Sequence, residues 1–310
     1  MNTALLLVIL VLQTFAIYYL IRTARNLGNK ATKQHKELMS NINLLRAGDG
    51  NNLLNHLNVP NNAAFSEVSW DHVISLTSYP ARFETLSKSI EMLLSQRLIA
   101  KKIYVNIAET DLHQLPNTLK AYESSGIVQI NSCTDIGPGK KLIPTLKLEN
   151  SLPIIVVDDD LIFETDLTLK LMIQHHLTPG SVIASRVHKI KYEADGRISL
   201  YKNWQKNFSL SDGPSSDLFP TSGAGTLYKA DFFHQDVVDE TAYKQYAMFT
   251  DDLWWYIQSL RKGTLTKRLP GLNHLNFIDG TQEVGLWKNG NQDRNDPNLK
   301  ALMNKYSLSI

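Results

Sequence analysis

The segment Pro153 to Phe163 constrains this chain more than any other part of the sequence. Its first half, Ile154 to Val157, is an unbroken run of β-branched residues, which is typical of a strand buried on both faces of a sheet. Three adjacent carboxylates, Asp158, Asp159 and Asp160, follow directly. Because these acids repel one another, they need a counter-charge, which we expect at the carboxyl end of a central strand.

Two interpretations of this acidic cluster, residues 158–160, follow from the sequence. A divalent cation shared with a phosphate-bearing substrate would supply the counter-charge, because hard cations bind carboxylate and phosphate oxygens together. The alternative is an exposed acidic turn after a strand. We favour the ligand site because open α/β sheets bind ligands at the carboxyl ends of their strands.

Length and composition set limits on the class of protein. A chain of 310 residues holds one large α/β domain or two small ones. Its net charge of +2 implies no general attraction to nucleic acid. The single cysteine, Cys133, excludes an internal disulfide and argues against a structural zinc site.

An apolar stretch, Ala4 to Ile21, lies near the start of the sequence. As a helix of roughly 18 residues it would be about 27 Å long, enough to span a hydrocarbon core. Basic residues follow this stretch and none precedes it. We therefore expect residues 1–22 to be a single transmembrane anchor with the bulk of the chain in the cytoplasm, and an export signal is the alternative.

The remaining chain divides into two parts. Residues 23–67 are polar and rich in asparagine, and we expect a stalk or linker there. Residues 68–310 alternate strand and helix patterns, which predicts an α/β domain with a mostly parallel sheet between helices. We expect a variable loop over residues 192–216 and a polar, loop-rich tail after Pro270. The expected strands cover residues 73–76, 103–107, 127–130, 154–157 and 181–184, and the expected helices cover 82–94, 116–125, 142–148, 167–177 and 251–261.

Four segments occur in an order that resembles a known family. They are Ile74–Arg82 (ISLTSYPAR), Asp135–Pro144 (DIGPGKKLIP), the acidic cluster and Thr250–Trp254 (TDDLW). In order and spacing they resemble the GT-A-type glycosyltransferases of bacterial surface polysaccharide and lipopolysaccharide synthesis, over roughly residues 68–310. The resemblance implies a GT-A-like, Rossmann-like fold and a membrane-anchored hexosyltransferase at the bacterial inner membrane.

The resemblance also implies a metal-dependent site for a nucleotide-sugar donor. Asp158 and Asp160 match the family's Asp-x-Asp motif. Asp160 would bind Mn²⁺ or Mg²⁺, Asp158 would bind the ribose or a metal-bound water, and the donor-binding role of Asp159 is open. The metal would neutralise the charge that builds on the diphosphate when the sugar–phosphate bond breaks. His274 would join the metal shell, with an ordinary loop histidine as the alternative.

Further donor contacts are implied in other segments. Thr77 would bind the base or ribose and Arg82 the phosphates, although Arg82 also suits the exposed start of a helix. Lys141 takes the position of the family's lysine and Lys140 replaces a threonine. Both would face the base or diphosphate, and the alternative is a Pro/Gly turn with two solvated lysines. The turn Ser222–Gly225 would bring backbone close to the donor or acceptor sugar.

Asp251 and Asp252 begin a predicted helix. An inverting transferase needs a base that removes the proton of the acceptor hydroxyl. The resemblance places this base at Asp252, with Asp251 as its neighbouring candidate. Helix capping is the alternative, because carboxylates are favoured at helix N-termini. We expect Trp254 and Trp255 to provide an apolar sugar platform, with one of them in the core.

The sequence therefore predicts a metal-dependent, inverting glycosyltransferase that moves a sugar from a nucleotide-sugar to a lipid-linked or polysaccharide acceptor. One alternative is a membrane-anchored haloacid-dehalogenase-type phosphatase, which also carries Asp-x-Asp after a strand. It is disfavoured because Leu161 follows the acids and because several predicted strands precede them. The other alternative is a non-catalytic polysaccharide-binding or scaffold protein.

Overall fold

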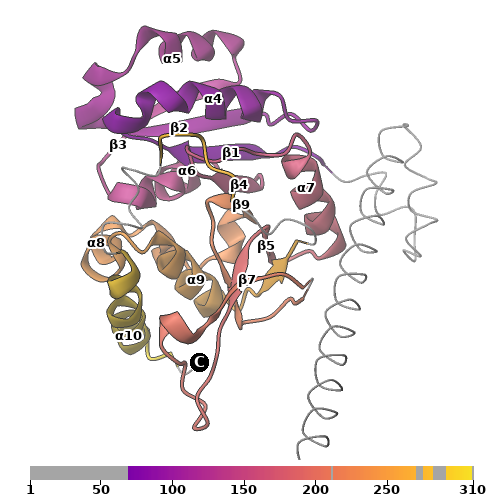
Figure 1. Ribbon diagram of the computed structural model, residues 1–310, viewed down its shortest axis with the longest axis vertical. Coiled ribbons are helices and arrows are strands. Elements are labelled where there is room, and N and C mark those ends of the chain that lie inside the picture. The colour runs from indigo at the N-terminus through magenta and orange to yellow at the C-terminus, as the bar shows by residue number, and fades with distance from the viewer. Residues whose placement is uncertain (1–68, 211, 270–274, 282–290, 309–310) are drawn as a thin grey trace, which may run out of the picture. The chain divides into compact units, whose positions relative to one another are not determined.

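A seven-stranded sheet forms the centre of the domain, in the order β10-β5-β9-β4-β1-β2-β3 (Figure 1). Every strand except β9 runs in the same direction, and β9 lies antiparallel between β4 and β5. The predicted α/β fold with a mostly parallel sheet between helices is confirmed. The strands are β1 (Val73–Thr77), β2 (Lys102–Ala108), β3 (Val128–Cys133), β4 (Ile154–Val157), β5 (Val182–Ala184), β9 (Ala224–Tyr228) and β10 (Thr266–Arg268).

Helices cover both faces of this sheet. In Figure 1, α4 and α5 lie over one face of β1, β2 and β3, and α6 lies on the opposite face. Helix α7 packs against β5 and β9, while α8, α9 and α10 pack on one another. The helices are α4 (Phe83–Leu94), α5 (Asn117–Ala121), α6 (Ile143–Leu148), α7 (Leu167–Leu177), α8 (Glu240–Ala247), α9 (Asp251–Lys262) and α10 (Asn295–Tyr306).

Local sequence patterns explain the best-predicted elements. Leu86, Ile90 and Leu93 of α4 are buried at helical spacing, which places one apolar side of the helix on the sheet. All of β4 is buried because β1 and β9 flank it on either side. The predicted bounds of β4 and α7 agree with the structure.

A second, three-stranded antiparallel sheet has the order β7-β6-β8. It consists of β6 (Val187–Lys189), β7 (Gln205–Phe208) and β8 (Leu218–Pro220). The prediction of a variable loop over residues 192–216 is therefore wrong in part. Its central segment is ordered because Tyr201 and Trp204 are buried in the core.

The prediction of a loop-rich tail is also wrong in part, because α10 occupies residues 295–306. Most residues of this helix are polar, but Leu299 and Leu302 form a buried apolar side. Asn298 Nδ2 also donates to Thr250 Oγ1 at 2.9 Å and so ties α10 to the start of α9.

This computed structural model describes residues 69–210, 212–269, 275–281 and 291–308, all within one compact unit, Asn61–Ile310. The predicted anchor (1–22), the predicted stalk (23–67) and His274 lie outside the described residues. Across the ranges that are described, no helix has the length and apolar character needed to cross a membrane.

Candidate active site

The site lies where the strand order reverses direction. β1 and β4 are adjacent and parallel, yet the chain continues from β1 toward β2 and β3 and from β4 toward the other side of the sheet. Open α/β sheets bind ligands at the carboxyl ends of strands at such a switch point. Thr77 ends β1 and Asp158 directly follows β4, so the acidic cluster occupies this position.

A cavity of about 1000 Å³ opens at this edge of the sheet. Its volume is at the upper end of the usual range for small-molecule sites, about 300–1,000 Å³. The residues predicted for catalysis, donor binding and metal binding that lie within the described ranges all line it: Thr77, Arg82, Lys140, Lys141, Asp158, Asp159, Asp160, Asp251 and Asp252.

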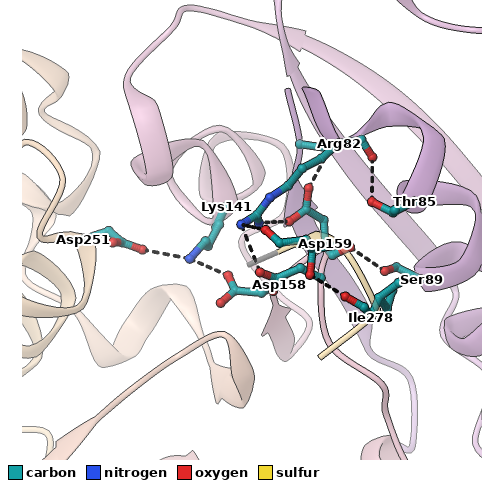
Figure 2. A network of polar contacts seen from close by, with 11 residues as sticks. Arg82, Thr85, Ser89, Lys141, Asp158, Asp159, Asp251 and Ile278 are labelled. Carbon is teal, nitrogen blue, oxygen red and sulfur yellow. Dashed lines mark hydrogen bonds and ion pairs between the residues drawn. The ribbon is translucent and has the colours of Figure 1, made fainter. Parts of the chain in front are cut away.

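Arg82 neutralises part of the acidic cluster. Its Nη1 lies 2.7 Å from Asp159 Oδ1 and its Nη2 lies 3.0 Å from Asp160 Oδ2 (Figure 2). Ser78 Oγ donates to the other oxygen of Asp159 at 2.6 Å. Burial opposes the charge on Arg82, but the two carboxylates raise its pKa above the ordinary value. Protein groups therefore bind both oxygens of Asp159, and Arg82 is an ion-paired residue instead of an exposed helix start.

Lys141 joins the acidic cluster to the first turn of α9. Its Nζ lies 2.5 Å from Asp158 Oδ1 and 3.4 Å from Asp251 Oδ2 (Figure 2). Burial opposes its charge, yet these carboxylates and Asp252 raise its pKa well above the ordinary value. Lys140 is buried as well and forms an ion pair with Asp135. The alternative of two solvated lysines is therefore wrong.

These ion pairs change the interpretation of the cluster. We expected a bound ligand to neutralise the three acids, whereas Arg82 and Lys141 already supply cationic partners. The requirement for an external counter-charge is therefore weaker than the sequence suggests. Within the ranges that the structure describes, no group of three or more His, Cys, Asp and Glu side chains is placed to hold a metal.

Negative charge nevertheless remains in excess at the acidic cluster. Burial and repulsion by Asp158 raise the pKa of Asp160 to about 6, although Arg82 acts in the opposite direction. A hard divalent cation would relieve this repulsion. Mg²⁺ commonly takes only one or two protein carboxylates and completes its shell with substrate phosphate and water. The side chains of Asp158 and Asp160 fit this requirement.

Asp252 lies across the cavity in the first turn of α9. Its Oδ1 accepts a hydrogen bond from the backbone N–H of Ser222 at 2.9 Å. Burial and the adjacent Asp251 raise the pKa of Asp252 to about 7. Thr250, and neither aspartate, is the N-cap residue of α9. The carboxylates of Asp251 and Asp252 thus have tertiary partners in addition to their favourable place at a helix start.

A buried polar network holds the segment that carries Lys141. Ser75 Oγ donates to the backbone carbonyl of Lys141 at 2.5 Å. Asn106 Nδ2 donates to Ser75 Oγ at 3.1 Å and to Thr145 Oγ1 at 3.0 Å. The sequence analysis missed these three residues, because single polar residues inside apolar strand and helix patterns give no signal for such a network. Thr77 Oγ1 also donates to the Asn106 carbonyl, at 2.7 Å.

The turn Ser222–Gly225 approaches the acidic cluster. The backbone N–H of Asp158 donates to the Gly223 carbonyl at 2.9 Å. A Cβ atom at position 223 would lie 1.8 Å from Asp158 Oδ2, so any larger residue there would have to displace the Asp158 carboxylate. The turn therefore makes close backbone contact with Asp158, and its residues Gly223 and Ala224 line the cavity.

The predicted tryptophan platform is wrong. Trp254 and Trp255 both have 0% exposure and belong to the core, because α9 packs beneath the other helices and the sheet. Trp254 Nε1 donates to the Val237 carbonyl at 2.9 Å. Tyr201 and Phe219 line the cavity instead. The segment Tyr201–Lys206 (YKNWQK) combines two aromatic and two basic residues, and this composition is the sequence signal for such a wall.

Comparisons with known proteins give limited information. No protein-family model and no curated protein matches the chain. Among solved structures, S. aureus TarS 1–349 in complex with UDP aligns with 12% identity and a TM-score of 0.44, over 66% of this chain and 60% of that chain. A second structure of S. aureus TarS 1–349 aligns with 16% identity and a TM-score of 0.42, over 66% and 59%. The chain thus spans about three fifths of those structures, and values this low establish neither a shared family nor a shared activity.

Proposed function

We propose that this chain is a glycosyltransferase that moves a sugar from a nucleotide-sugar donor to a lipid-linked or polysaccharide acceptor. One observation carries the proposal. Carboxylates at the switch point between β1 and β4 share a cavity with Asp252, a carboxylate whose pKa is raised to about 7. This combination provides a polar, charged site for a diphosphate and a base for an acceptor hydroxyl.

The donor would lie over the carboxyl ends of β1 and β4. Arg82 and Lys141 would orient the diphosphate by charge, and Thr77 and Lys140 would contact the base or ribose. Asp158 and Asp160 would hold Mn²⁺ or Mg²⁺, which when bound would neutralise the charge on the diphosphate. Asp159 would keep Arg82 in place through the ion pair at 2.7 Å.

Asp252 would act as the general base, with inversion at the anomeric carbon. The acceptor oxygen forms a bond to this carbon while the bond between the carbon and the phosphate oxygen breaks. The hydroxyl proton passes to the Asp252 carboxylate, and the nucleoside diphosphate leaves with the bonding electron pair. Asp252 must be ionised before the reaction, and a pKa of about 7 allows this at neutral pH. Asp251 would assist by holding Lys141.

Membrane attachment completes the proposal. Residues 1–22 would anchor the enzyme in the bacterial inner membrane and residues 23–67 would form the stalk. The catalytic domain would then meet lipid-linked acceptors at the cytoplasmic surface. Extraction of membranes with alkaline carbonate tests the anchor, because a transmembrane segment keeps the protein in the membrane fraction.

Titration of nucleotide-sugars tests the activity class. The full chain would be titrated by calorimetry with uridine-, guanosine- and cytidine-linked sugars, with Mn²⁺ and again with a chelator. We expect one donor to bind, with much lower affinity in the chelator. Asp158→Asn should weaken this binding, whereas the exposed control Asp231→Asn should not.

Other outcomes would contradict parts of the proposal. If the donor bound with equal affinity in the presence of the chelator, the proposed role of the metal would be refuted. Arg82 and Lys141 would then be the ligands of the diphosphate. No binding of any donor by the folded chain would refute the transferase. Hydrolysis of a phosphate monoester in that case would identify the phosphatase alternative, and its absence would favour a scaffold protein.

A further inference from the structure

Two cations that line the cavity, Arg186 and Lys206, form no ion pair among the described residues, in contrast to Arg82, Lys140 and Lys141. Burial lowers the pKa of Arg186, and the carboxylates of Asp252 and Asp158 oppose this shift without forming an ion pair with it. Arg186 Nε and Lys206 Nζ are both buried atoms without a hydrogen-bond partner. A desolvated cation without a counter-charge is unfavourable, and a bound anion is the usual remedy.

Arg186 is held rigidly beside the proposed base. It directly precedes β6, and its Nη1 donates to Thr221 Oγ1 at 2.7 Å. The backbone N–H of Thr221 in turn donates to the Arg186 carbonyl at 3.0 Å. The next residue, Ser222, binds the Asp252 carboxylate through its own N–H. Two consecutive residues thus hold the two groups: Thr221 binds the guanidinium of Arg186, and Ser222 binds the carboxylate of Asp252.

Lys206 lies on β7, the strand that pairs with β6. Its Nζ lies 2.9 Å from the centroid of the Tyr201 ring, so the ammonium group rests on an aromatic wall. Burial lowers its pKa to about 8, with a smaller contribution from Arg186 in the same direction. The carboxylate of Asp296 opposes this shift but forms no ion pair with Lys206 among the described residues, and its Oδ1 accepts the backbone N–H of Tyr201 at 2.7 Å.

A neighbouring histidine, His188, adds no third positive charge to this region. Burial, Arg186 and Lys206 lower the pKa of His188 to about 3, so the ring is neutral at physiological pH. Its Nδ1 accepts the backbone N–H of Asn207 at 3.2 Å. The region is therefore a small aromatic and cationic corner of the cavity, lined by Arg186, His188, Tyr201, Lys206 and Phe219.

We propose that Arg186 and Lys206 form an anion subsite for the acceptor, which carries a phosphate or carboxylate group close to the attacking hydroxyl. The inference rests on the proposed transferase function and specifies its substrate class. The acceptor side is favoured because Arg186 directly precedes β6 and Lys206 lies on β7 of the three-stranded sheet, next to the segment that holds Asp252. The cations at the donor end, Arg82 and Lys141, follow β1 and β3 of the main sheet.

The experiment measures anion binding directly, without knowledge of the acceptor. The full chain, saturated with the nucleoside diphosphate of its donor where one binds, is titrated by calorimetry with glycerol 3-phosphate, glycerate and glycerol. We expect one of the two anions to bind and glycerol not to bind. The comparison of glycerol 3-phosphate with glycerate distinguishes a phosphate-bearing acceptor from a carboxylate-bearing one.

Variants assign the binding to these residues. Arg186→Gln and Lys206→Gln should each weaken anion binding by about tenfold or more, since each removes a charge-assisted contact. Arg186→Lys should recover part of it. Lys202→Gln is the matched control, because this lysine is exposed on the neighbouring 3-10 helix Tyr201–Asn203. Thermal unfolding of each variant confirms that it is folded.

Three results would overturn the proposal: displacement of the anion by the nucleoside diphosphate, equal binding of glycerol, or unchanged affinity in both glutamine variants. No anion binding at millimolar concentration would overturn it as well. Failure of the transferase proposal is recognised separately. In that case no nucleotide-sugar binds, while anion binding in the chain alone still depends on Arg186 and Lys206.

Discussion

Replacement of Asp252 by asparagine should stabilise the folded chain at neutral pH and at the same time remove sugar transfer. Asp252 is largely buried beside the carboxylate of Asp251, so its ionisation opposes folding. Asparagine has nearly the same shape and can still accept the hydrogen bond that Ser222 donates at 2.9 Å. It carries no charge and cannot act as a base.

The magnitude follows from the pKa of Asp252 in the two states. Its pKa is about 7 in the folded chain and 3.8 ordinarily, a difference of about three units. At about 1.36 kcal/mol per unit the full effect is about 4 kcal/mol. We expect roughly 2 kcal/mol, because solvent reaches part of this side chain and screens its charge.

The sign of the pH dependence is fixed by the raised pKa. Below about pH 4 the carboxyl group is protonated in both states, and its ionisation has no effect on stability. Between about pH 4 and pH 7 the unfolded state loses the proton first, so the wild-type chain loses stability as the pH rises. The Asp252→Asn variant lacks this loss, and its advantage should be small at pH 4 and full at pH 8.

Thermal unfolding across this pH range measures the effect. An advantage of roughly 2 kcal/mol corresponds to about 4–8 °C in the unfolding midpoint of a domain of this size. Asp231→Asn, a change at an exposed carboxylate, should show no such pattern. An advantage that is absent at pH 8, or equally large at pH 4, would refute the assignment of a raised pKa to Asp252. Unchanged transfer would separately refute its role as the base.

Three further predictions test other parts of the site. The rate of transfer should rise with pH through about 7 and then level off, because Asp252 must be ionised; a profile of kcat/KM that falls over this range would contradict the assignment. Arg82→Met should lower the free energy of unfolding by about 3–5 kcal/mol, because it leaves Asp159 buried without its cation. A loss below about 1 kcal/mol, measured by urea unfolding, would show that the ion pair contributes little. Gly223→Ala should displace Asp158, since the new Cβ would lie 1.8 Å from its Oδ2. We expect the free energy of unfolding to fall by about 1–3 kcal/mol and donor binding in calorimetry to weaken. Unchanged values of both quantities would contradict the close contact.

The sequence by itself determined the parts of this protein that depend on local pattern. The bounds of β4 and α7 and the mostly parallel sheet follow from apolar runs and helical spacing, which report burial directly. The position of the acidic cluster follows as well, because residues after a buried strand must emerge at an edge of the sheet. Thr77, at the end of β1, opens into the same cavity for the same reason.

Only the tertiary structure decided which groups neutralise one another. Arg82 and Asp159 are 77 residues apart in the chain, and no local pattern indicates that they pair. The antiparallel strand β9, the buried pair Trp254 and Trp255, and helix α10 likewise depend on packing between distant segments. The same holds for Arg186, which forms no ion pair within the part of the chain that the structure describes. Which charged side chains surround it in space cannot be read from the order of residues along one segment.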